Sequence, residues 1–253
     1  MKRQNISSES YPGGSLVSFE SMEGQMVQMP ATILNQLGLV APSVLAPSIN
    51  LSAFVPTERV VLVNLDNFGL LEVVLHKPQF LLKEANVLLT LDTEDGFAQN
   101  VINELIHGNR RDGFNLFSFL IHQGKSAVIV DRENQREKVG QATFQSADTD
   151  MRTYIETAKR LNRSDLLYIH FLDFDTLYKE HTSRPPLELA QKLLHRTDRW
   201  LLGFYKQARA NTLFLILGNQ GQRDYGLKYE GKYQNWATAN VPICLVIYKP
   251  AGE

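Results

Sequence analysis

Strand-length apolar runs recur along this chain, and segments with helical spacing of apolar residues separate them. The runs lie at residues 60–65, 85–91, 126–130, 166–172, 212–217 and 241–248. A strand covered on both faces is expected to be apolar along its whole length, unlike a strand with one face in water. Strands that alternate with helices favour parallel pairing. The sequence therefore predicts an α/β fold, with a mostly parallel sheet and helices on both faces.

The first 57 residues lack this alternation of strand and helix patterns. We therefore expect a flexible or wrapping N-terminal segment at 1–57 and one α/β domain at 58–253. Within the segment, 31–38 is typical of a short helix ended by Gly38. Residues 41–58 contain three prolines and read as a connector. This segment could dock on a partner, complete a homodimer or pack back on its own sheet.

Two later stretches carry expectations of their own. Residues 131–147 are polar and predict a loop or small excursion. Asp148 and Asp150 precede a helical pattern, where N-terminal caps belong. The last apolar run has Pro242 near its start, which indicates either an edge strand or the beginning of a strand.

Charge and composition exclude several classes of protein. Lys and Arg number 26 and Asp and Glu number 27, giving a net charge of -1. The positive field that drives nucleic-acid binding and attraction to anionic membrane surfaces is absent. No apolar run approaches the length of a membrane span, and no apolar stretch follows the basic N-terminus. With one cysteine, Cys244, there is no intrachain disulfide, and we expect a cytoplasmic protein.

Polar clusters follow three of the apolar runs, where the ligand sites of parallel sheets lie. The residues are Asp66 and Asn67 after the first run, Asp173, Asp175 and His181 after the fourth, and Asn219 and Gln220 after the fifth. They would converge if the three strands are neighbours. The alternative for each cluster is helix capping or turn formation. His181 alone suits a loop, and His170, inside a run, suits a hydrogen-bonded core position.

The order of these pieces resembles the alkaline phosphatase superfamily over roughly residues 58–250. VVLVNLDNFG is similar to the first strand with its metal-binding Asp, and YIHFLDFDTLYKEHTSRPP to the segment with a D-x-x-G-H pattern. LELAQKLLHRTDRWLLGFYKQA matches the long helix that follows, TLFLILGNQG the strand ending in Ser-Asp-His-Gly, and VPICLVIY the closing strand. Active members carry two metal ions, usually zinc, which activate a Ser or Thr nucleophile.

The resemblance implies a site with several ligands lost. Asp66 matches the first Asp, and Asp173 or Asp175 the second. Lys179 falls where the pattern requires a histidine, with His181 two residues beyond it. Asn219 and Gln220 stand where Asp and His belong, and neutral amides supply neither charge nor imidazole. The late histidine has no counterpart.

The nucleophile position also lacks a suitable residue. It aligns with Ala98, and Thr93 is reached only by shifting the alignment. The sequence therefore predicts a non-catalytic binding or interaction module without a cofactor, acting on a ligand, a protein partner or a second copy. Its candidate ligand-binding residues are Asp66, Asn67, Asp173, Asn219 and Gln220.

An alternative keeps catalysis in a metal-dependent phosphoester hydrolase or phosphodiesterase. Asp66, Asp175 and His181 would hold one divalent cation such as zinc, and Thr93 or water would attack. Asn219 and Gln220 would contact substrate oxygens. A further alternative is an unrelated doubly wound fold, which an incompatible strand order would reveal.

Overall fold

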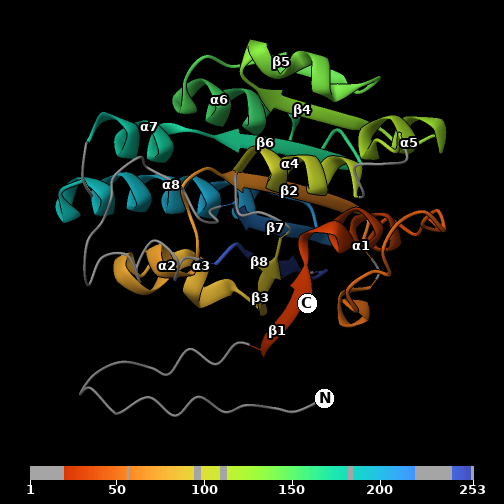
Figure 1. The fold of residues 1–253 in the computed structure, drawn as a ribbon, viewed down its shortest axis with the longest axis horizontal. Coiled ribbons are helices and arrows are strands. Elements are labelled where there is room, and N and C mark those ends of the chain that lie inside the picture. The colour runs from red at the N-terminus through yellow and green to blue at the C-terminus, as the bar shows by residue number, and fades with distance from the viewer. Residues whose placement is uncertain are drawn as a thin grey trace.

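The computed structural model describes residues 20–55, 57–93, 98–108, 113–181, 185–219 and 241–251 (Figure 1). Their strands are β1 (Glu20–Gln25), β2 (Arg59–Leu65), β3 (Val87–Asp92), β4 (Ala127–Asp131), β5 (Thr143–Ser146), β6 (Leu166–Phe171), β7 (Thr212–Gly218) and β8 (Ile243–Lys249). Their helices are α1 (Met29–Gln36), α2 (Leu70–His76), α3 (Gln79–Glu84), α4 (Ala98–His107), α5 (Leu116–His122), α6 (Asp150–Arg160), α7 (Asp173–Glu180) and α8 (Leu187–Gln207). Each predicted apolar run corresponds to a strand.

The strands form one sheet in the order β1-β3-β8-β7-β2-β6-β4-β5. All neighbouring pairs are parallel except the two that involve β8, which runs antiparallel to both β3 and β7. The α/β class and the mostly parallel sheet are thus confirmed. Pro242 comes just before β8, so it marks the beginning of a strand, and that strand lies inside the sheet.

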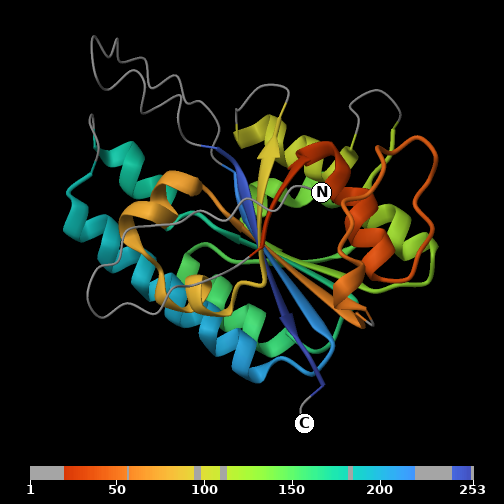
Figure 2. The ribbon, with the colours of Figure 1, turned by 90° about the horizontal axis from the view of Figure 1, so that it is seen from below.

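Helices cover both faces of the sheet, as Figure 2 shows along its edge. Alternate residues of a strand point to opposite faces. In β2, Leu62 packs with α1, α4 and α5, whereas Val61 and Val63 pack with α2, α3 and α6–α8. Two buried apolar layers therefore hold the sheet between the helices.

The long helix α8 is amphipathic. Ala190, Leu194, Leu201 and Phe204 form its buried side, and the side chain of Asp198 reaches from it to α3. Asp198 accepts hydrogen bonds from the backbone amides of Phe80 and Leu81, 2.8 and 3.0 Å long, at the start of α3. Within the described ranges no helix combines the length and apolar composition needed to cross a bilayer.

The described part of the N-terminal segment wraps onto the sheet. β1 pairs in parallel with β3 at the sheet edge, and α1 buries Ile33 and Leu34 in the core. The Thr32 hydroxyl accepts a 2.9 Å hydrogen bond from the amide of Ile49, tying the connector to α1. Gly38, with φ of 73°, ends the helical stretch as expected. Residues 20–55 therefore belong to the core of the domain, while 1–19 lie outside the described residues.

The polar stretch 131–147 holds more structure than its composition indicates. A 3₁₀ helix spans Glu133–Val139, and β5 adds a strand beside β4 at the second edge of the sheet. An edge strand faces water along one side, so it does not need a continuous apolar run. The Arg136 guanidinium lies 4.6 Å above the Phe144 ring, which covers this strand.

Candidate ligand site at the carboxyl edge of the sheet

The predicted convergence of the three polar clusters is confirmed for one or two residues of each. β7, β2, β6 and β4 are consecutive and parallel, so their carboxyl ends meet at one edge. Asn219 Nδ2 donates a hydrogen bond to Asp66 Oδ1, linking β7 to β2. Asn67 Nδ2 donates to Asp175 Oδ1 over 3.0 Å, linking β2 to α7.

The backbone after β2 passes very close to the end of β7, and this approach brings Asn219 next to Asp66. A Cβ on Gly218, the last residue of β7, would lie 2.5 Å from the carbonyl oxygen of Phe68. Asn67, just before Phe68, adopts a left-handed conformation with φ of 61°. Asparagine tolerates that region better than most residues. The turn after β2 therefore bends across the end of β7, and only glycine leaves room for it.

Replacing Gly218 with alanine is expected to destabilise the protein by about 1–3 kcal/mol, because backbone must shift to admit the methyl group. Gly203→Ala is the matched control. A Cβ there meets only the Tyr154 hydroxyl at 3.6 Å, and alanine in a helix is favoured over glycine by up to about 1 kcal/mol. Urea unfolding should show opposite signs for the two variants. Equal stability of Gly218→Ala and the wild type would contradict the close approach.

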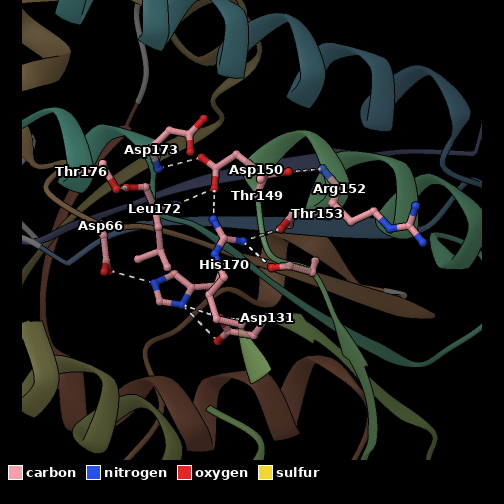
Figure 3. A network of polar contacts seen from close by, with 12 residues as sticks. Asp66, Asp131, Thr149, Asp150, Arg152, Thr153, His170, Leu172, Asp173 and Thr176 are labelled. Atoms are coloured by element: carbon pink, nitrogen blue, oxygen red, sulfur yellow. Dashed lines mark hydrogen bonds and ion pairs between the residues drawn. The ribbon is translucent and has the colours of Figure 1, made fainter. Parts of the chain in front are cut away.

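A histidine lies between two carboxylates at this edge (Figure 3). His170 Nε2 is 3.0 Å from Asp66 Oδ1, and its Nδ1 is 2.9 Å from Asp131 Oδ1. All three side chains are largely buried. Asn64 Nδ2 also donates to Asp66 Oδ1 at 3.1 Å. The two carboxylates bracket opposite sides of one imidazole.

The two carboxylates determine the protonation state of His170. Burial by itself lowers the pKa of His170, but the negative charges of Asp66 and Asp131 outweigh it and raise that pKa to about 10. Burial and the same two carboxylates raise the pKa of the neighbouring Tyr168. At neutral pH the site therefore holds an imidazolium ion and a neutral phenol.

A second carboxylate–cation pair lies on α7. Lys179 Nζ is 2.6 Å from Asp175 Oδ2, one helical turn away. Asp175 is buried, whereas the Lys179 side chain is mostly exposed. Lys179 is the residue that stands where the family pattern requires a histidine. The structure gives this position a side-chain ammonium that pairs with the carboxylate.

The turn between β6 and α7 is held by Asp150 (Figure 3). Its carboxylate accepts hydrogen bonds from the backbone amides of Leu172 and Asp173, each 2.9 Å long. Arg132 Nη2 donates to it at 2.8 Å. Asp150 therefore positions the start of α7, and the N-cap of α6 is Thr149, whose hydroxyl accepts from the amide of Arg152.

A pocket of about 360 Å³ opens beside these groups, on the face of the sheet covered by α4 and α5. The polar residues that line it are Asp66, Asp131, Arg132, Asn134, Gln135, His170, Asp175, Thr176, Lys179 and Asn219. Ile102, Ile106, Phe117, Ile129, Val139, Tyr168 and Leu172 form the rest of the wall. A concave site with an apolar wall and a few converging polar groups is typical of small-molecule binding.

The structure places only part of the predicted site in this pocket. Asp66, Asp175 and Asn219 line it, and Asn67 supports it through Asp175. Asp173 does not line it, and pairs instead with Arg196 at 2.7 Å. Gln220 lies outside the described residues.

Two further candidates lie away from the pocket. His181 ends α7 and its Nδ1 is 2.8 Å from the Leu177 carbonyl oxygen; it is not a lining residue. Thr93 follows β3, which is separated from β2 by β8 and β7. Three strand spacings of about 4.8 Å put the two strand ends roughly 14 Å apart. The structure thus does not join Thr93 or His181 to Asp66.

His170 and Asp131 are the site residues that sequence reasoning missed. His170 occupies the buried strand position expected for a core histidine, but its partners are two carboxylates at the pocket. One signal was present: Asn64, His170 and Asp131 are polar residues at or next to the ends of three apolar runs. Only the strand order β4-β6-β2 shows that they are neighbours.

The donors that lie in the described part of this site do not fit a two-metal centre. Asp66 and Asp175, the carboxylates that the family pattern assigns to metal, already face an imidazolium and an ammonium. Asn219 contributes a neutral amide. Among the described residues, no group of three or more His, Cys, Asp or Glu side chains could hold a metal ion. The alternative set of Asp66, Asp175 and His181 is therefore not assembled.

The fold is similar to that of solved proteins of the alkaline phosphatase superfamily. A protein of this superfamily from Vibrio parahaemolyticus, known from its crystal structure, superimposes with a TM-score of 0.53 and 12% sequence identity. The match covers 76% of this chain and 60% of that one, so this chain spans less than two thirds of its length. The C-terminal periplasmic domain of EcEptC from Escherichia coli, crystallised with Zn, matches with a TM-score of 0.51 and 11% identity, over 78% and 74% of the two chains.

Sequence comparison alone finds no such relationship: no family model and no curated protein matches the chain. The likeness therefore shows the fold and leaves the chemistry to be argued from the residues. The superposition over most of this chain favours the phosphatase-like arrangement over an unrelated doubly wound fold.

Proposed function

We propose that this protein is a non-catalytic binding or interaction module built on an alkaline-phosphatase-like fold, with the two-metal site lost. One observation carries the proposal: His170 lies within 3.0 Å of both Asp66 and Asp131, so a side-chain cation already occupies the space between the carboxylates that would attract a metal. Lys179 supports it by pairing with Asp175. A divalent ion would have to displace both cations.

Metal titration and turnover test this proposal together. Calorimetry with zinc, manganese and magnesium should give no saturable heat that Asp66→Ala removes. Hydrolysis of nitrophenyl phosphate and bis-nitrophenyl phosphate should stay at the background rate with each metal, in the wild type and in Asp66→Ala alike. Metal-dependent turnover that Asp66→Ala abolishes would reject the proposal.

The alternative function is a phosphoester hydrolase with a rearranged single-metal site. The observation that favours it is the pair of carboxylates, Asp66 and Asp175, on one pocket wall. A single-metal site here would need a ligand other than His181. Thr93 lies three strands away from Asp66, so it is not placed to act as the nucleophile. Turnover that survives Thr93→Ala and is lost in Asp66→Ala would support attack by water.

A protein partner or second copy remains part of the proposal. The stretch after α1 exposes Val40 and Val55, which are 89% and 57% accessible. Light scattering should report a change of mass in Val40→Asp if this surface mediates self-association. We also assign the protein to the cytoplasm, which its lone and buried cysteine, Cys244, suits.

A further inference from the structure

We propose that the pocket at the carboxyl edge of the sheet binds a small uncharged molecule with an apolar ring and a hydrogen-bond donor at one end. The inference rests on the proposed function, because it takes the site to be without metal. It names the ligand class of that site. Its grounds are the apolar wall, an unsatisfied acceptor and the carboxylates of the lining, which are already in contact with side-chain cations.

The apolar wall fits a ring-sized body. Ile102 and Ile106 come from α4, Phe117 from α5 and Ile129 from β4. The volume of about 360 Å³ is near the lower end of the range for ligand pockets, which begins at about 300 Å³. This room suits a molecule with one ring and a short substituent.

The acceptor is Asn219. Its side chain is fully buried and lines the pocket, and its Nδ2 is committed to Asp66. That bond fixes the orientation of the amide. Oδ1 is buried and has no hydrogen-bond partner among the described residues. A buried carbonyl oxygen without a partner is costly, so a ligand hydroxyl or N–H donor would satisfy it.

The charges around the pocket disfavour an ionic ligand. Three carboxylates line it, those of Asp66, Asp131 and Asp175, and they would repel a phosphate or phosphonate. The side chains of His170 and Lys179 already contact these carboxylates, at 2.6 to 3.0 Å, so a ligand cation would have to compete with them for the same oxygens. Arg132 is committed to Asp150, Thr153 and the Ala147 carbonyl oxygen. An uncharged donor therefore suits the site better than either ion.

Three probes with the same ring separate these possibilities: benzyl alcohol, benzylamine and benzylphosphonate. Titration of the full chain, followed by amide chemical shifts in NMR, gives the affinity of each. Thr176→Trp should block the pocket from its exposed rim, and Glu180→Trp on the same helix is the matched control outside the lining. Asn219→Leu removes the acceptor.

Benzyl alcohol should bind most tightly of the three, at least tenfold more weakly in Thr176→Trp and Asn219→Leu, and unchanged in Glu180→Trp. Tighter binding of benzylphosphonate or benzylamine would overturn the inference, as would no binding of benzyl alcohol at millimolar concentration or equal affinity for Thr176→Trp. Metal-dependent turnover would reject the proposed function separately, since the probes are measured without added metal.

Discussion

Replacing His170 with alanine is expected to destabilise the protein by about 3–5 kcal/mol, the largest effect of any single substitution considered. The imidazolium is buried between Asp66 and Asp131. Its removal leaves two carboxylates close together, with little solvent and without the cation that balances them. Breaking a buried ion pair by deleting one partner costs about this much, since the remaining charge stays desolvated.

Urea unfolding at neutral pH measures this loss, and His122→Ala is the control because His122 is exposed near the end of α5. The control should remain within about 0.5 kcal/mol of the wild type. The triple variant that combines His170→Ala with Asp66→Asn and Asp131→Asn should recover part of the loss, as it removes the unbalanced charge. A loss below about 1 kcal/mol for His170→Ala would show that the trio is not a buried ionic network.

Much of the fold could be predicted because its signals are local. Continuous apolar runs located the strands from β2 to β8 other than β5, and glycine after α1 marked a helix end. β5 was missed because an edge strand needs no apolar run. β1 was missed because its residues, Glu20–Gln25, are exposed or half-buried along the sheet edge.

Sequence reasoning could predict only those site residues that closely follow a strand. Asp66, Asn67, Asp175 and Asn219 follow apolar runs, and parallel strands bring such residues together at one edge. The role of His170 depends on which strands flank β6, and that order is a long-range property that no local pattern contains. The pairing of His170 with Asp66 therefore became evident only from the strand order of the sheet.

The stability of the protein should fall as the pH rises from about 6.5 toward 10. Burial lowers the pKa of His170, but Asp66 and Asp131 raise it to about 10 in the folded state, against about 6.5 in the unfolded chain. The histidine's contribution is thus fully present below pH 6.5. Between the two values unfolding releases a proton, so this contribution declines by roughly 1.4 kcal/mol per pH unit and is lost above the folded pKa.

Free energies of unfolding in urea at pH 7 and pH 8.5 measure this dependence. The wild type should lose about 2 kcal/mol more than His170→Ala over this interval. Burial also raises the pKa values of Cys244 and Tyr168, which ionise in the unfolded chain at about pH 8.5 and about pH 10, so the stability lost through these two groups begins at the upper end of the chosen window and increases beyond it. Because both groups remain in His170→Ala, subtracting its slope isolates the histidine. Parallel slopes for the two proteins would mean that His170 is neutral in the folded state, and the carboxylates of Asp66 and Asp131 would then need another source of positive charge.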